Sequence, residues 1–149
     1  MNTLALSFTM LLTLAVSSVA HAQDPECFVA GSNFDVCDFA KRFQEETAPE
    51  LPMAVSGDMT MDSVIALGPE VTFGVRWPSG WEQLQARMVL NDKTLEDVSK
   101  QLQVNAENAV CSAKTLRAFV TLGGKVAYAY RTSDGHMIYT ARVENCEAP

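Results

Sequence analysis

Four cysteines constrain the fold of this 149-residue chain more than any other feature of its sequence. They are Cys27, Cys37, Cys111 and Cys146, and all of them follow an apolar N-terminal stretch. An even number of cysteines in an exported chain indicates two disulfide bonds, and four cysteines allow three pairings. We expect Cys27–Cys37 and Cys111–Cys146, because each pair closes a unit that is also local in the pattern of helices and strands. No spacing has the C-x-x-C form of zinc or redox sites, so we expect no metal site.

The N-terminal stretch indicates export. Residues Leu4 to Val19 are almost all apolar or small, and Ala20-His21-Ala22 follows with the small-x-small pattern that signal peptidase cleaves. We therefore expect residues 1–22 to be a cleaved signal peptide, although the first three residues contain no Lys or Arg. No cysteine stands at the predicted cleavage site. The expected product is a periplasmic or secreted protein without a stable membrane anchor.

Composition narrows the class of protein. A formal charge of −7 with only 11 Lys and Arg residues argues against a nucleic-acid-binding protein, which needs a basic face. The hydrophobic fraction of 48% argues against disorder. The remaining length suits one domain, which we place at residues 23–149 with a helical segment at residues 23–50.

Periodicity predicts the elements of this domain. A helix capped by Ser32 or Asn33 is expected before Pro49, and an antiparallel hairpin over residues 59–77 turns at Gly68-Pro69-Glu70. Residues 81–90 fit either a strand or a short helix. Helices are expected over residues 94–111, with Thr94 and Asp97 as a capping box, and over residues 113–122. A second hairpin, with strands at residues 126–131 and 137–143, turns at Thr132-Ser133-Asp134-Gly135.

These elements define the expected fold class. It is an α+β fold with an antiparallel sheet of about four strands, built from the two hairpins, and with helices packed on one face. Two disulfide bonds would staple it.

The C-terminal third also resembles a group of proteins. Cys111 precedes a short helix that ends at Gly123-Gly124, an aromatic strand from Val126, the Asp134-Gly135 turn, and a last strand that closes at Cys146. This order is similar to that of small, exported, uncharacterised proteobacterial proteins, and the segment from Leu51 to Val55 with its hairpin resembles their upstream half. The resemblance implies an α+β fold and a Cys111–Cys146 bond, but it supplies no catalytic residue.

Few residues suggest chemistry. His136 is the only histidine after the predicted cleavage site, and a histidine just after a turn is typically an exposed surface residue. Carboxylates occur close together at Asp35/Asp38, Glu45/Glu46, Asp58/Asp62 and Glu96/Asp97. Two of them could serve a small hydrolase, yet most such groups are solvated or favour a helix N-terminus. We therefore expect no catalytic residue, no metal and no cofactor.

Two tryptophans suggest binding instead. Trp77 and Trp81 flank the turn Pro78-Ser79-Gly80, where aromatic side chains could anchor a partner or lie beneath the loop as core. Residues 23–75 also contain ten acidic and two basic residues, a bias that could steer a basic partner. We expect a non-enzymatic binding or accessory protein whose partner is another protein. The alternatives are a periplasmic immunity or inhibitor protein and, less favoured, a carboxylate-dependent hydrolase.

Overall fold

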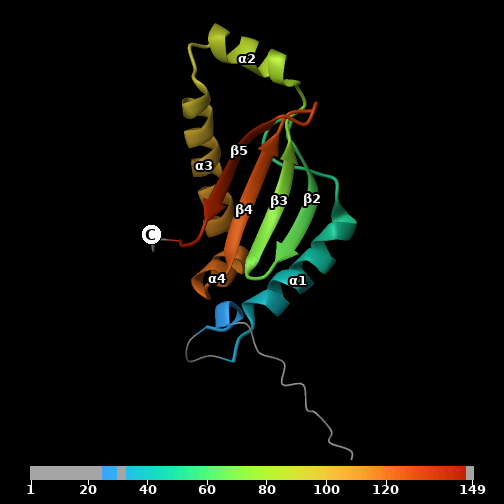
Figure 1. The fold of residues 1–149 in the computed structure, drawn as a ribbon, viewed down its shortest axis with the longest axis vertical. Helices are drawn as coiled ribbons and strands as arrows, with labels where there is room; N and C mark the ends of the chain where they lie inside the picture. The colour runs from blue at the N-terminus through green and yellow to red at the C-terminus, as the bar shows by residue number, and fades with distance from the viewer. Residues whose placement is uncertain (1–24, 30–32, 147–149) are drawn as a thin grey trace, which may run out of the picture.

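The structure is a computed structural model that describes residues 25–29 and 33–146. Blocks of helices and strands follow one another along this part of the chain. Figure 1 shows one twisted sheet with helices beside it and beyond one end. The elements, in chain order, are η1 (Pro25–Cys27), α1 (Val36–Thr47), η2 (Ala48–Glu50), β1 (Met53–Ala54), β2 (Thr60–Leu67), β3 (Glu70–Arg76), α2 (Trp81–Leu90), α3 (Leu95–Ser112), α4 (Lys114–Thr121), β4 (Lys125–Arg131) and β5 (Met137–Val143).

The sheet differs from the predicted one in two respects. It has five strands in the order β1-β2-β3-β4-β5, because the two-residue strand β1 pairs with β2. The β2–β3 and β4–β5 hairpins are antiparallel as predicted, but β3 and β4 are parallel. The reason is the long connection between them: α2, α3 and α4 carry the chain back to the end of the sheet where β3 began. The α+β class is therefore confirmed, whereas the expected antiparallel sheet of about four strands has five strands and is only mostly antiparallel.

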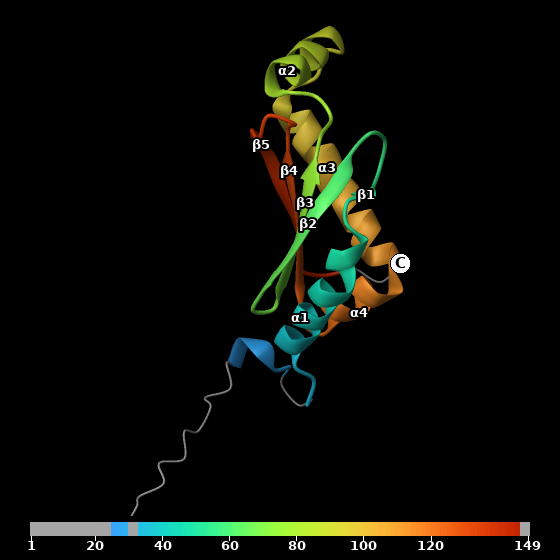
Figure 2. The same ribbon diagram turned by 90° about the vertical axis from the view of Figure 1, so that its right-hand side faces the viewer.

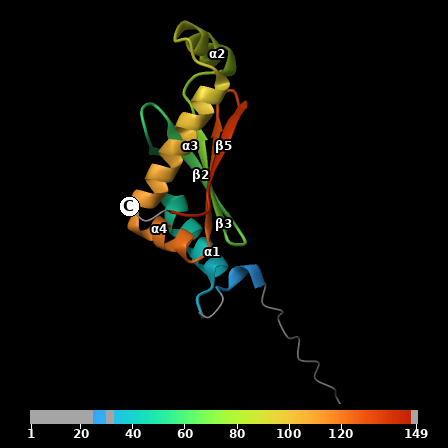
Figure 3. The same cartoon turned by 90° about the vertical axis from the view of Figure 1, so that its left-hand side faces the viewer.

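The prediction that helices cover one face of the sheet is confirmed. Figures 2 and 3 show α1, α3 and α4 on the same side of the strands, and no described helix on the other side. Helix α1 packs against β2 and β3, α3 packs mainly against β5, and α4 packs against β4. The ambiguous segment 81–90 is helix α2, which lies beyond the end of the strands in Figure 1.

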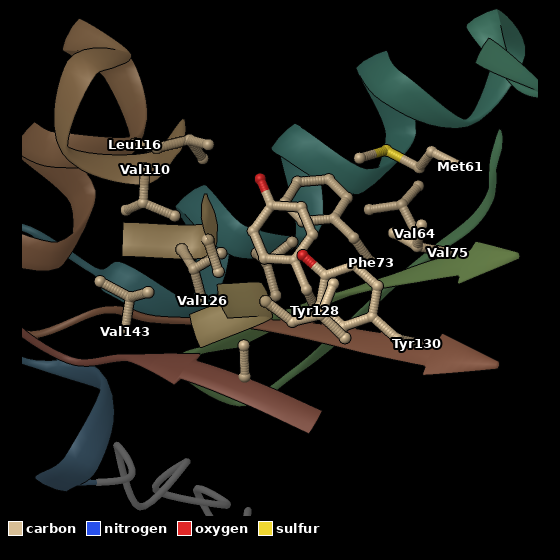
Figure 4. Packing of buried hydrophobic residues seen from close by; sticks show 14 of the residues in the cluster. Met61, Val64, Phe73, Val75, Val110, Leu116, Val126, Tyr128, Tyr130 and Val143 are labelled. Carbon is tan, nitrogen blue, oxygen red and sulfur yellow. The ribbon is translucent and has the colours of Figure 1, made fainter. Parts of the chain in front are cut away.

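The hydrophobic core fills the space between the sheet and these helices. Side chains at alternate positions of neighbouring strands are in register, so that Val71 lies opposite Val126 and Val126 opposite Val143. Figure 4 shows Val126 and Val143 pointing toward the helical layer. Aromatic rings extend the packing from α1 into the sheet, with ring centroids 6.0 Å apart for Phe43 and Phe73 and 5.0 Å apart for Phe73 and Tyr128.

Helix ends follow local hydrogen-bonding rules. The α1 N-cap is Asp35, whose carboxylate accepts hydrogen bonds from the backbone N–H groups of Cys37 and Asp38, both at 2.9 Å. The prediction of an Asn33 cap was wrong, and the alternative cap Ser32 lies outside the described residues. The capping box at Thr94 and Asp97 is confirmed.

Two disulfide bonds link η1 and the segment after β5 to helices. Cys27 is bonded to Cys37 and Cys111 to Cys146, which is the pairing expected from the sequence. The first bond joins η1 to α1, and the second joins α3 to the segment after β5. The predicted signal peptide lies outside the described residues. Within the residues that are described, no helix has the length and apolar character needed to cross a membrane.

Candidate binding site

Trp77 lies in an apolar groove on the side of the sheet that the helices cover. Its backbone N–H donates to the Arg131 carbonyl at 2.7 Å, which fixes the chain where β3 ends. Its half-buried side chain lines a groove of about 260 Å³ between α3 and the β1–β2 loop. Figure 3 shows that loop beside the N-terminal half of α3. The lining residues are Met59, Trp77, Lys93, Val98, Gln101, Leu102 and Asn105.

Helix α3 supplies most of one wall of this groove. Val98 and Leu102 lie on the stripe of the helix that begins with Leu95, because positions three and four apart share a face. Leu102 is buried, Val98 is partly buried and Leu95 is 40% exposed, so the apolar stripe emerges into solvent toward α2. The capping box at Thr94 fixes where the helix and its stripe begin. Val89 and Leu90, which end α2, are about 80% exposed (79% and 83%) and add apolar surface at the same corner of the fold.

Trp81 occupies a different place. Its ring stacks on His136 from the β4–β5 turn, with the ring centroids 4.1 Å apart. The two residues line a second shallow cavity, of about 620 Å³, together with Glu82, Gln83 and Asp134. The sequence therefore predicted two aromatic residues for one binding turn, whereas the structure places them in two separate cavities.

Asp134, in the β4–β5 turn, fixes the first turn of α2, from which it is distant in sequence. Its carboxylate accepts a hydrogen bond from the Trp81 backbone N–H at 3.0 Å and another from the Thr132 hydroxyl. The Thr132 hydrogen bond, followed by that from Trp81, lowers the pKa of Asp134 below its ordinary value. Gly80, the residue at the α2 N-cap position, has no side chain that could do this. Asp134 is thus a capping residue supplied by a distant turn.

The free edge of the sheet is partly closed at β5. The Gln103 side-chain amide on α3 donates to the Arg142 carbonyl at 2.8 Å and accepts from the Arg142 backbone N–H at 3.3 Å. The Tyr139 hydroxyl donates to the same amide oxygen at 3.1 Å. One side chain therefore imitates a neighbouring strand at this position, which disfavours strand addition there.

The carboxylate pairs considered for catalysis have structural partners. In every pair at least one member caps a helix or forms an ion pair: Asp35 caps α1, Glu45 pairs with Lys41, Asp62 with Arg76 and Arg131, and Glu96 with Lys100. The Thr94 hydrogen bonds lower the pKa of Asp97. A downward shift is the opposite of what a general acid requires.

The cysteines offer no thiolate for metal binding. Among the described residues, Cys27, Asp35 and Cys37 have potential ligand atoms within 4.8 Å of one another, but the two sulfurs are bonded to each other. Cys111 and Cys146 line a polar groove of about 660 Å³ with Glu107, Arg142 and Glu144. Both pairs are structural links.

Sequence reasoning singled out Trp77 as a candidate but not the residues that surround it. Met59, Lys93 and Val98 come from three separate segments, and only the tertiary fold brings them to Trp77. The helical stripe from Leu95 was visible in the sequence as an apolar pattern, but not the fact that its first residue is exposed.

Solved structures with a similar fold come from proteobacteria. A protein of Pseudomonas aeruginosa described as secreted has a TM-score of 0.57 and 14% sequence identity, covering 73% of this chain and 88% of that one. The pilotin EpsS of the Vibrio vulnificus type 2 secretion system has a TM-score of 0.60 and 14% identity, covering 76% and 94%. The type II secretion system pilotin AspS of Vibrio cholerae has a TM-score of 0.52 and 18% identity, covering 72% and 87%.

At such low identity these likenesses concern the fold. Neither protein-family profiles nor curated proteins match the sequence. The neighbours agree with the expected resemblance in fold to exported proteobacterial proteins. The two disulfide bonds are consistent with an extracytoplasmic location.

Proposed function

We propose that this chain is a non-enzymatic, extracytoplasmic accessory protein that binds an apolar segment of a partner protein in the Trp77 groove. The observation that carries the proposal is the continuity of apolar surface from Trp77 and Val98 to the exposed Leu95 on α3. Aromatic and aliphatic side chains in a concave site are typical anchors for a partner.

The chemistry of the groove favours binding over catalysis. Its side chains include one charged group, the Lys93 ammonium, and no carboxylate or histidine. An ammonium at the rim suits a partner segment that carries a carboxylate beside its apolar anchors. The similarity in fold to two pilotins supports an accessory role in an envelope secretion system. An immunity or inhibitor protein remains the alternative, which the identity of the partner decides.

Site-specific photo-crosslinking in cells tests the proposal. A photoreactive phenylalanine at Gln101, which is exposed and lines the groove, should form one major crosslink to an envelope protein. The same group at the exposed Lys114 on α4 is the matched control and should not form it. Identical products at both positions, or none at Gln101, would contradict the proposal.

A second measurement uses the partner identified in that way. In a Trp81→Phe background Trp77 is the only tryptophan, and binding should shift its fluorescence emission to shorter wavelength. Leu95→Asp, at a 40% exposed position, should weaken binding by about tenfold without changing the melting temperature. Unchanged affinity of that variant would remove the α3 stripe from the site.

A further inference from the structure

The face of the sheet opposite the helices has its own chemical character. Strand register places a row of small side chains across its middle, one from each of β2 to β5: Ser63, Gly74, Ala129 and Thr140. Figures 2 and 3 show no described helix over this face. Charged residues flank the row on both sides.

Positive charge is concentrated on this open sheet face. On one side of the row Arg76 lies opposite Arg131. On the other side are Lys125, opposite Glu70, and Arg142, which lies opposite Ala127 with its Nε 3.9 Å from the Glu70 carboxylate. The face therefore has four cations against two carboxylates, Asp62 and Glu70, although the whole chain has a formal charge of −7. Because surface charges act over a Debye length of about 8 Å at physiological salt, the local excess decides what this face attracts.

Asp62 forms ion pairs with two arginines on this face. Its carboxylate lies between two guanidinium groups, 2.7 Å from Nη2 of Arg131 and 3.3 Å from Nε of Arg76. The Asp62 side chain is only 13% exposed, whereas those of Arg76 and Arg131 are 47% and 42% exposed. Since each guanidinium has five N–H donors, both arginines keep donors that point to solvent. Asp62 thus acts as an internal carboxylate ligand that leaves this pair with excess positive charge.

Apolar side chains adjoin the cations at two places, on β2 and at Met137 of β5, which lies opposite Arg131 and is 55% exposed. Ile65 and Leu67 are on β2, opposite Thr72 and Glu70, and are 59% and 80% exposed. A lipid surface would be met by apolar side chains spread over the whole contact area. Here only three do so, Ile65 and Leu67 on β2 and Met137 on β5, and the four cations lie on β3, β4 and β5. This pattern fits a chain segment with carboxylates on one side and a few apolar residues on the other.

We propose that the open sheet face is a second docking surface, which binds an acidic segment of a partner protein by its carboxylates. It lies on the opposite side of the sheet from the Trp77 groove, so the chain can hold two protein segments at once. The acidic segment lies over the row of small residues, between the Arg76–Arg131 pair and the Lys125–Arg142 pair.

Charge substitutions of opposite effect test this surface. The probe is a fluorescein-labelled decapeptide of alternating glutamate and serine, and fluorescence anisotropy reports its binding to the purified, disulfide-intact protein at low salt. Combined Lys125→Gln and Arg142→Gln should weaken binding by about fivefold, and neither residue belongs to the Asp62 network. Asp62→Asn, which releases two guanidinium groups, should strengthen binding by about threefold.

The control distinguishes local charge from net charge. Combined Lys41→Gln and Lys114→Gln on α1 and α4 changes the net charge as much as the first variant does, and should leave the affinity unchanged. Equal weakening by the control, or weaker binding by Asp62→Asn, would overturn the proposal. Binding to phosphatidylglycerol vesicles without binding to the peptide would overturn it as well and would assign the face to a membrane. Neither result would alter the outcome of the Gln101 crosslinking experiment.

Discussion

The phenol of Tyr128 is buried in the core between β3, β4 and the helical layer. Burial raises its pKa to about 12, and the neighbouring Tyr130 makes a smaller contribution in the same direction. The physical cause is that a phenolate in this position would lose its hydration without gaining a cation. The residue therefore stabilises the fold only in its neutral form.

Alkaline pH should reveal this effect. The unfolded phenol ionises near pH 10, so the stability linked to Tyr128 is fully present below that pH and is lost as the pH rises toward about 12. We expect the free energy of unfolding to fall by about 2 kcal/mol over this window because of Tyr128 alone. Urea denaturation at a series of pH values measures it. Tyr128→Phe keeps the ring and should flatten the decline, whereas an unchanged decline would mean that other groups cause it.

At the scale of elements, α2 depends on a cap from another part of the chain. Asp134→Ala removes the acceptor for the Trp81 N–H, so we expect the first turn of α2 to fray. Amide hydrogen exchange over residues 81–84 should accelerate by about fivefold. Glu82→Gln, in the same turn, is the control and should change exchange little.

The effect of Asp134 should also depend on pH. Because the pKa of this carboxyl is lowered in the folded state, the stability it provides is present above about pH 4 and is lost as the pH falls through the lowered value. Protection of α2 should thus decrease in acid in the wild-type protein and stay constant in Asp134→Ala. Equal acid sensitivity of the two proteins would show that the cap does not control α2.

On its free edge, strand β5 has its Arg142 backbone groups hydrogen-bonded by a single side chain, Gln103 of α3. Gln103→Leu should lower the free energy of unfolding by about 1–2 kcal/mol, because the Arg142 N–H and C=O lose their partner. It should also promote self-association through the uncovered edge, detectable by sedimentation. Gln103→Glu keeps the acceptor and loses the donor, so it should give an intermediate stability. A Gln103→Leu protein that is fully stable and monomeric would contradict the role we assign to this amide.

For the molecule as a whole, the two disulfide bonds should differ in their contributions. Cys111–Cys146 spans a sequence separation of 35 and joins α3 to the end of the sheet, whereas Cys27–Cys37 spans 10 near the described N-terminal end. Loop-closure entropy makes the longer link worth about 1 kcal/mol more. The double Cys→Ala variant of Cys111 and Cys146 should therefore melt at a lower temperature than that of Cys27 and Cys37. The reverse order would mean that packing alone holds β5.

Sequence patterns predicted the parts of the fold that local chemistry decides. Alternating residues and the Asp134-Gly135 turn are sufficient to define the C-terminal hairpin, and Thr94 with Asp97 defines the start of α3. Strand β1 has only two residues, too few for a periodicity. The parallel pairing of β3 with β4 depends on the path of three helices, which no local pattern specifies. For the same reason Trp77 could be singled out, but not its contacts with α3.

The parallel β3–β4 pair also has a kinetic consequence. Both hairpins can form from neighbours in sequence. The β3–β4 pairing that joins them requires residues 77–124 to be arranged first, because Glu70 pairs with Lys125 on the far side of that connection. Such non-local pairings raise contact order and slow folding. The folding chain would thus spend its longest interval as two half-sheets, each with an unpaired strand edge. That interval is when the protein is most exposed to aggregation and to proteases.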